Sequence, residues 1–205
     1  MMPRFPDCFP AANTEGLVYP AEYENFEWTT SFFSGMLWLL YEHTGDPVYR
    51  PILQKHLESF YERVEAPGSL DTHDLGFLYS LSCYPAVLLQ KDPRAEACFL
   101  KAAQALRSRY FPQAGIIQAW GNLGDPQNRG RMIIDCLLNL PLLYQAARLT
   151  GDRSFWEMAY CHAKQAQKHL VRPDSTTYHT FYMNVDTGEP RFGRTAQGYS
   201  DSSCW

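Results

Sequence analysis

The chain has 205 residues, of which 45% are hydrophobic and 20% charged, and its formal net charge is −4. These values exclude a disordered chain and two large domains. They predict a single domain over residues 1–205 that opens with an irregular segment over residues 1–27. Because lysine and arginine form no block, neither nucleic acid nor a membrane surface is an expected partner.

Six cysteines are present, and none forms a CxxC pair, so a zinc site is not expected. We interpret them as small buried thiols of a protein in a reducing compartment, the cytoplasm. No apolar stretch approaches the roughly 20 residues of a membrane span, and the first ten residues lack the apolar core of a signal peptide.

Helical periodicity dominates, and strand signals are nearly absent. Caps, breakers and apolar spacing predict an all-α chain with helices over residues 28–45, 47–66, 74–90, 93–110, 133–151 and 152–170. Pro85 and Pro141 fall inside two of these segments, where a kink or a boundary is expected. The polar region after Pro173 suggests a short hairpin around residues 184–190.

The predicted helices form pairs in which an apolar helix precedes an amphipathic one. The joints look alike, and Asp46, Asp92 and Asp152 occupy equivalent turns in them. This indicates a helical-hairpin repeat of about 50 residues. Such hairpins stack as an open solenoid or close into an α/α toroid, and the spacing does not choose between the two.

Asp71, His73 and Asp74 lie directly before the apolar run that follows Leu75. A carboxylate there either caps the helix or faces a substrate. Asp71 offers a second candidate for the cap, so Asp74 is not needed for it. His73 considered alone is better explained as a packed core histidine.

Asp135 lies between isoleucine and leucine pairs, in the string Ile-Ile-Asp-Cys-Leu-Leu. A carboxylate inside so apolar a helix is costly unless it is paired or faces a cavity. Burial would raise its pKa and keep it protonated near neutral pH, as a general acid requires. The alternative is a buried salt bridge to an arginine such as Arg131.

Asp74 and Asp135 each begin the apolar helix of a hairpin, in successive repeats. In a toroid, such ends converge on one cavity, where two carboxylates are a recurrent arrangement for glycoside chemistry. Trp120 could supply a stacking face for a sugar or be a core residue, and the same holds for Trp28 and Trp205. His179 is either a pocket residue or part of an ordinary polar loop.

The strings DTHDLGFLYSLS, RMIIDCLLNLPLLYQAARLTGD and RTAQGYSDSSCW together resemble the unsaturated glucuronyl hydrolase family, glycoside hydrolase family 88. The segment that begins at Trp28 is similar to the family's opening helix. The resemblance covers the chain from about Trp28 onward. It implies helical hairpins of an (α/α)6 toroid, with about half to two-thirds of the barrel present in this chain.

The resemblance also implies a reaction. These enzymes hydrate the 4,5-unsaturated uronic acid at the non-reducing end of oligosaccharides that lyases produce, here of the glycosaminoglycan type. Asp135 matches the aspartate that protonates C4, and Asp74 matches the second aspartate, which positions the sugar. Residues that match the substrate-binding positions are His73, Trp28, Trp120, His179, Gly193, Thr195, Gln197 and Trp205. No metal or organic cofactor is implied.

Relatives place a histidine where this chain has Ala196, a departure that bears on substrate preference. They also continue beyond Trp205 with a string whose arginine and tryptophan help to hold the uronate. We therefore expect weak or no activity from these 205 residues alone, and exposed apolar flanks on the helices. The alternatives are an unsaturated rhamnogalacturonyl hydrolase acting on pectin fragments and a non-catalytic helical scaffold. The chain could also form a homo-oligomer.

Overall fold

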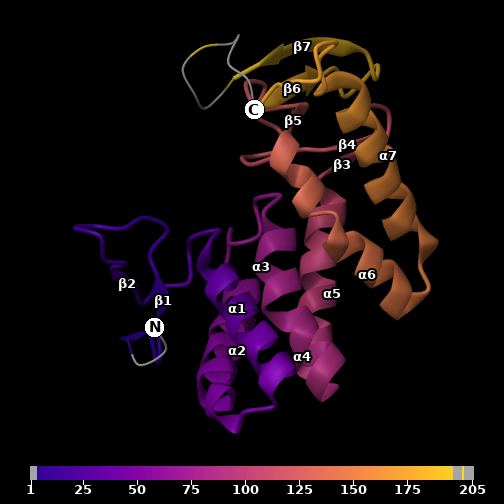
Figure 1. Ribbon diagram of the computed structural model, residues 1–205. Coiled ribbons are helices and arrows are strands. Elements are labelled where there is room, and N and C mark those ends of the chain that lie inside the picture. Colours follow the sequence, from indigo (N-terminus) through magenta and orange to yellow (C-terminus); the bar gives the residue numbers. More distant parts are fainter. Residues whose placement is uncertain (1–3, 196–199, 201–205) are drawn as a thin grey trace. The chain divides into compact units, whose positions relative to one another are not determined.

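The computed structural model describes residues 4–195 and Ser200, and it divides into two compact units. The first unit comprises residues 1–70 and 75–102, and the second comprises residues 71–74 and 103–205. About half of the chain is helical, and helices are the main elements, as expected (Figure 1). Within the described residues, no helix is long and apolar enough to cross a membrane.

The first unit contains an irregular entry segment followed by helices. Residues 4–29 contain a short ladder between β1 (Phe9–Pro10) and β2 (Ala21–Glu22) and an isolated bridge between Glu15 and Val18. The helices then follow in chain order: α1 (Thr30–Thr44), the 3-10 turn η2 (Pro47–Tyr49), α2 (Arg50–Glu65), α3 (Leu75–Leu81), α4 (Cys83–Gln90) and α5 (Pro93–Ser108). The predicted helix over residues 74–90 is therefore two helices, α3 and α4, which meet at Ser82. Pro85 explains the boundary, since it has no N–H to donate to the preceding turn.

Three joints between helices share one local structure. In each, a residue with left-handed backbone ends the first helix, and φ is 67° at Gly45, 57° at Lys91 and 73° at Gly151. The next residue is an aspartate whose carboxylate accepts a backbone N–H two residues later. These bonds run from Val48 to Asp46, from Arg94 to Asp92 and from Ser154 to Asp152, at 2.8–2.9 Å. The predicted equivalence of the three turns is confirmed.

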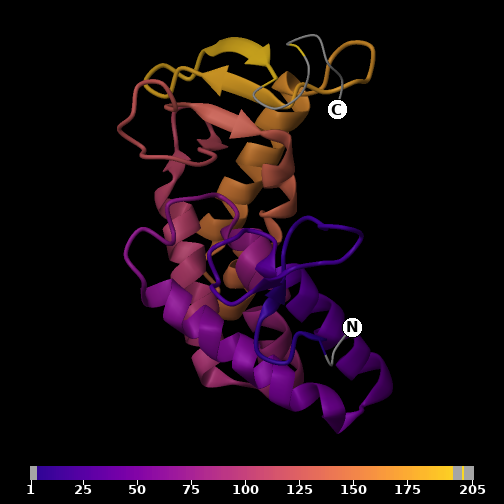
Figure 2. The same cartoon turned by 90° about the vertical axis from the view of Figure 1, so that its left-hand side faces the viewer.

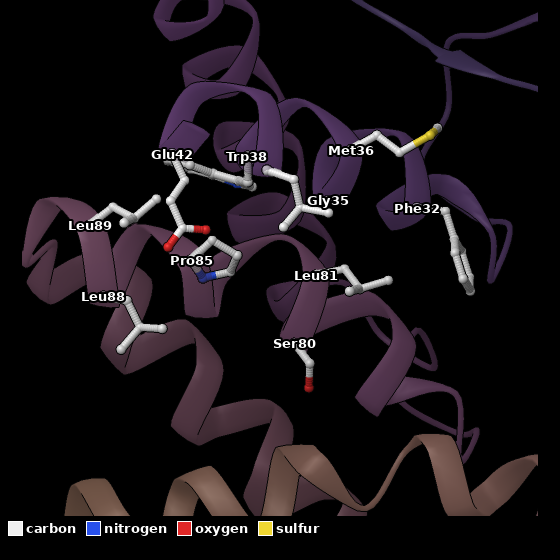
Figure 3. Close-up of a pocket in the computed structure, with 11 residues that line it drawn as sticks. Phe32, Gly35, Met36, Trp38, Glu42, Ser80, Leu81, Pro85, Leu88 and Leu89 are labelled. Carbon is white, nitrogen blue, oxygen red and sulfur yellow. The ribbon is translucent and has the colours of Figure 1, made fainter. Parts of the chain in front are cut away.

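Helix α1 and helices α3 and α4 border an apolar groove of about 420 Å³ (Figure 3). Its lining side chains include Phe32, Met36 and Leu39 from α1 and Leu88 and Leu89 from α4. These five side chains are 39–66% exposed. The expected exposed apolar flanks are thus present on these helices.

The second unit holds a sheet that the sequence did not predict in full. Strands β5 (Arg131–Ile133), β6 (Thr180–Met183) and β7 (Pro190–Arg194) pair antiparallel in the order β5-β6-β7, and Figure 2 shows β6 and β7 as adjacent arrows. The β6–β7 connection confirms the predicted hairpin, with Asn184 N–H donating to the Glu189 carbonyl at 2.8 Å. A two-residue ladder joins β3 (Tyr110–Phe111) to β4 (Ile116–Ile117).

The expected helix over residues 133–151 is wrong in its first half. Residues 131–133 form β5, residues 134–138 form the 3-10 helix η3 (Ile134–Leu138), and the α-helix α6 runs only over Pro141–Thr150. Pro141 does not interrupt a helix but begins one, where its missing N–H costs nothing. Helix α7 (Arg153–His169) follows and agrees with the prediction.

One face of the sheet packs on the end of α7. Met132, Phe181 and Met183 from the strands are buried with Ala166 and Leu170. Gly130, which precedes β5, has φ 83°, and a Cβ there would lie 2.1 Å from the Met183 carbonyl oxygen. The sheet therefore requires glycine at this position.

We predict that Lys91→Gly stabilises the chain. Lys91 is the only non-glycine residue among the three equivalent left-handed positions, and a Cβ is strained in that conformation. Allowing for the added backbone freedom of glycine in the unfolded chain, the gain is at most about 1 kcal/mol, or roughly 2–4 °C in Tm. Thermal unfolding followed by circular dichroism measures it.

Lys91→Ala is the matched control, because it removes the lysine side chain but keeps the Cβ. It should leave Tm nearly unchanged, whereas Gly45→Ala should lower it. A Tm that falls in Lys91→Gly would show that the left-handed backbone at this joint is not strained.

Candidate active site

Asp135 is placed by a strand rather than by an α-helix. After β5, the backbone N–H of Ile134 donates to the His179 carbonyl at 3.0 Å, which ties the chain to the start of β6. The chain then turns into η3, whose first turn carries Asp135. The carboxylate therefore lies at a strand-to-helix junction, where the backbone N–H groups of Asp135 and Cys136 act on it.

Asp74 directly precedes Leu75, the first residue of α3. The Thr72 hydroxyl donates to Asp74 Oδ2 at 2.7 Å and accepts the Asp74 N–H at 3.1 Å. Asp71 lies four residues ahead of the helix, too far for the capping role that the sequence suggested for it.

His73 brings the two carboxylates together. Its ring is 1% exposed, and Nε2 lies 3.3 Å from Asp74 Oδ1 and 3.6 Å from Asp135 Oδ1. The predicted convergence of Asp74 and Asp135 is thus present in the structure, with an imidazole between them.

Burial and the neighbouring carboxylate of Asp74 make Asp135 a weaker acid than an aspartate in water. Burial, followed by the charge of Asp74, raises the pKa of Asp135 to about 6. Its Oδ1 atom is buried and has no hydrogen-bond partner among the described residues. Within residues 4–195, no ion pair joins Asp135 to Arg131, the alternative that the sequence left open.

His73 is a neutral imidazole. Burial, followed by the charges of Arg109 and Arg131, lowers its pKa to about 3. A neutral imidazole carries one proton, and Nε2 faces two carboxyl oxygens while Nδ1 has no partner in the described part of the chain. We therefore assign the proton to Nε2, which donates toward the carboxyl groups.

Trp120 borders this cluster. Its ring centroid lies 6.4 Å from that of His73 in an edge-on arrangement, and the indole is half-buried. The guanidinium of Arg131 lies over the indole, with Cζ 3.9 Å from the ring centroid. Trp120 is therefore neither fully in the core nor in solvent.

Buried residues that the sequence analysis missed hold the loop that carries Trp120, residues 117–121, in place. Arg109 is 2% exposed and donates to the carbonyls of Gln118, Ala119 and Gly121. His162 on α7 is fully buried and accepts the Ile117 N–H through Nδ1 at 2.8 Å. The one signal for Arg109 was a cation close to an apolar strand, which is too common to indicate a role.

The predicted substrate-binding residues His179, Gly193 and Thr195 are each partly or fully buried. His179 is buried, its Nδ1 lies 2.7 Å from the Thr180 hydroxyl, and burial and Arg131 lower its pKa, so it is not a solvated loop residue. Gly193 lies on β7, where a Cβ would be 2.6 Å from the Tyr178 ring, which gives the glycine a structural reason. Thr195 is 9% exposed.

Trp28 belongs to the first unit. It is 46% exposed and packs against Phe32 and Phe77, with centroid distances of 5.9 and 5.4 Å. Gln197 and Trp205 lie outside the described residues.

The cluster of His73, Asp74 and Asp135 also has the composition of a metal site, because one ligand atom from each lies within 4.8 Å of the others. Arg109 and Arg131 act electrostatically on His73, and their charges disfavour a further cation. The expectation that no metal is needed stays a prediction.

Two carboxyl groups in different environments, one with a raised pKa, beside a half-buried tryptophan are typical of enzymes that cleave glycosides. The comparisons with known proteins agree. The profile described as Glycosyl Hydrolase Family 88 matches residues 2–201. The chain belongs to this family.

Two characterised relatives illustrate the match. The unsaturated glucuronyl hydrolase of Bacillus sp. (strain GL1) is 46% identical over 202 residues, which cover 98% of this chain and 53% of that protein. The unsaturated chondroitin disaccharide hydrolase of Streptococcus pyogenes serotype M1 is 45% identical over 204 residues, covering 100% and 51%. The chain thus spans about half the length of these relatives.

Solved structures support the fold class. The crystal structure of the Bacillus sp. GL1 enzyme has a TM-score of 0.93 at 46% identity, covering 100% of this chain and 54% of that one. The unsaturated glucuronyl hydrolase from Streptococcus agalactiae also has a TM-score of 0.93, at 42% identity, covering 100% and 51%. The predicted class, helical hairpins of an α/α toroid with about half of the fold in this chain, is confirmed.

We predict that Asp135→Asn stabilises the chain at neutral pH. Because the folded-state pKa of Asp135 is raised to about 6, its contribution to stability is complete below the unfolded pKa of about 4 and is lost as pH rises through 6. With its side chain 41% exposed, a discounted gain of about 2 °C in Tm is expected at pH 7.5 and almost none at pH 4.

Calorimetry at both pH values measures the difference. The buried histidines destabilise the chain as pH falls, but they do so in both proteins and cancel in the comparison. The exposed Glu62→Gln on α2, in the first unit, removes a charge of the same sign away from this cluster and is the matched control. An Asp135→Asn chain that melts below wild type at pH 7.5 would contradict the raised pKa.

Proposed function

We propose that the protein hydrolyses unsaturated uronic acid at the non-reducing end of lyase-generated glycosaminoglycan oligosaccharides. The observation that carries the proposal is the Asp135 carboxyl group, whose pKa is raised to about 6 beside Asp74 and a neutral His73. Relatives named unsaturated glucuronyl hydrolase and unsaturated chondroitin disaccharide hydrolase support it.

The proposed chemistry begins with a proton transfer. Neutral Asp135 donates its proton to C4 of the vinyl ether, and positive charge develops at C5 and the ring oxygen. The charge of Asp74 stabilises this state. Asp135, now a carboxylate, accepts a proton from the water that adds to C5, which restores the acid. The hemiketal opens and releases the keto sugar and the shortened saccharide.

Other residues of the proposal bind the sugar. Trp120 and His73 border the carboxyl pair. Trp28, His179, Gly193, Thr195, Gln197 and Trp205 are proposed contacts on the grounds of the family resemblance. No cofactor has a part in this chemistry.

The pectin alternative is less well supported, because the relatives named above act on glucuronyl or chondroitin substrates. A purely structural scaffold does not explain why a partly buried acidic group is kept beside another one at a cost in stability. We also propose a reducing compartment, the cytoplasm. In support, Cys8, Cys83, Cys98 and Cys136 are buried, as small apolar thiols of such a compartment are, although Cys161 is exposed.

The first test is a hybrid enzyme in which this chain replaces the matching half of the Bacillus relative. It should consume unsaturated chondroitin disaccharide, measured as loss of the ultraviolet absorbance of the conjugated double bond. Asp135→Asn should lower the rate by about 10³-fold, because it removes the general acid without changing the shape of the side chain.

The 205-residue chain alone is assayed beside the hybrid, with turnover expected to be weak or absent. An unsaturated disaccharide from pectin serves as the second substrate and should be consumed much more slowly. A hybrid that unfolds cooperatively but leaves the chondroitin absorbance unchanged, or whose Asp135→Asn form retains its rate, would refute the proposal.

The pH dependence gives a second test. The acid must be protonated, so the rate should be level just below pH 6 and should fall about tenfold per pH unit well above it. Initial rates of the hybrid between pH 5.5 and 8 measure this limb. A rate that stays constant up to pH 8 would exclude Asp135 as the proton donor.

A further inference from the structure

Arg131 is a buried cation for which the proposed reaction has no use. It is 6% exposed, lies on β5 and precedes Asp135 by four residues. Its Nε has no hydrogen-bond partner in the described ranges, and it forms no ion pair there. A buried guanidinium left so incompletely paired is costly, so its position calls for an explanation.

The guanidinium is directed at a single neighbour. Its Cζ lies 3.9 Å from the ring centroid of Trp120, the shortest cation–ring distance in the described part of the chain, and Nη2 lies 3.4 Å from the Trp120 carbonyl oxygen. A planar guanidinium in this position covers one face of the indole.

Arg109 and Arg131 hold different parts of the loop that carries Trp120. Arg109 donates to the carbonyls on both sides of Trp120, and the Ala119 N–H donates to the Arg131 carbonyl at 2.9 Å. These bonds fix the backbone. The Trp120 side chain, in contrast, is held through Arg131 on its face and meets His73 at a centroid distance of 6.4 Å.

The charge of Arg131 also changes what the indole can bind. A bare aromatic face is negative and repels a carboxylate, whereas a cation against one face offsets that potential at the other. The same charge acts on the neighbouring imidazoles and helps to keep His73 and His179 neutral. The indole is therefore a flat apolar surface in a locally positive field.

We propose that Arg131 is a positioning residue that fixes the indole of Trp120 as a platform for a sugar and makes that platform favour an anionic sugar over a neutral one. The inference rests on the proposed function for the identity of the sugar, an unsaturated uronate. The contact that holds the ring does not depend on any reaction.

The first experiment uses the 205-residue chain without ligand. The mobility of the Trp120 indole is followed by the nuclear Overhauser effect of its Nε1–H, with the signal assigned through Trp120→Phe. Arg131→Met and Arg131→Lys should both loosen the ring, because neither side chain has a planar guanidinium to lay against it. An indole that stays rigid in both variants overturns the positioning role.

The second experiment separates charge from shape. The same chain is titrated with unsaturated chondroitin disaccharide and with its methyl ester, which lacks the charge. Wild type should prefer the acid by about tenfold. Arg131→Lys should keep most of this preference, and Arg131→Met should lose it. The specificity role is overturned if neither ligand changes the indole signal of the wild-type chain. It is also overturned if Arg131→Met keeps the preference for the acid over the methyl ester.

Arg94→Met is the matched control. Arg94 lies over Tyr61 at 4.2 Å, so the variant removes the same kind of contact from the first unit and should change neither readout. If Arg131→Met does not fold, Arg131→Lys still decides the ring mobility. If the hybrid enzyme is inactive while the ring mobility and the ligand preference respond as expected, only the proposed reaction is refuted. If the hybrid enzyme is active while the ring mobility and the ligand preference do not change in the Arg131 variants, only this inference is refuted.

Discussion

The structure of the site depends on an imidazole that is too deeply buried to take a charge. Since His73 stays neutral, it cannot neutralise the two carboxyl groups that face its Nε2. Two negative charges within 4.8 Å of each other and partly removed from water repel each other. The state of lower free energy therefore has a proton on one of the two carboxyl groups. Asp135 holds it because burial disfavours its charge. Of the fixed cations nearby, Arg109 donates hydrogen bonds to the backbone and Arg131 lies over the indole.

The parts that the sequence predicted are those set by local chemistry. The aspartates at the three joints act on N–H groups two residues away, so each is visible in a window of a few residues. The turn after Asn184 is local in the same sense. The pairing of Asp74 with Asp135 is not local. It was predicted only because both occupy the same place in successive hairpins, and the family resemblance pointed to the same residues.

The parts that the sequence did not predict depend on distant partners. Met132 and Ile133 fit a helix or a strand equally well, and their strand partner, β6, lies about 50 residues later in the chain. Helix propensity was therefore a poor guide there, and Asp135 was placed in the wrong element. The same limit applies to Arg109 and His162, whose importance lies in which carbonyls and amides they reach.

The joints between helices have a consequence for how this architecture can change over time. Each one completes its own hydrogen bonds, with a left-handed residue to end one helix and an aspartate to start the next. The backbone of such a joint is closed by its own residues, while side-chain bonds from Tyr61 to Asp92 and from Arg107 to Asp152 link two of the joints to the preceding hairpin. A hairpin can therefore be duplicated, lost or exchanged as a whole piece at the cost of such side-chain bonds. The strand that carries Asp135 lacks this independence, because its partners come from elsewhere in the chain. Chemistry in this fold is thus anchored where the architecture is least modular.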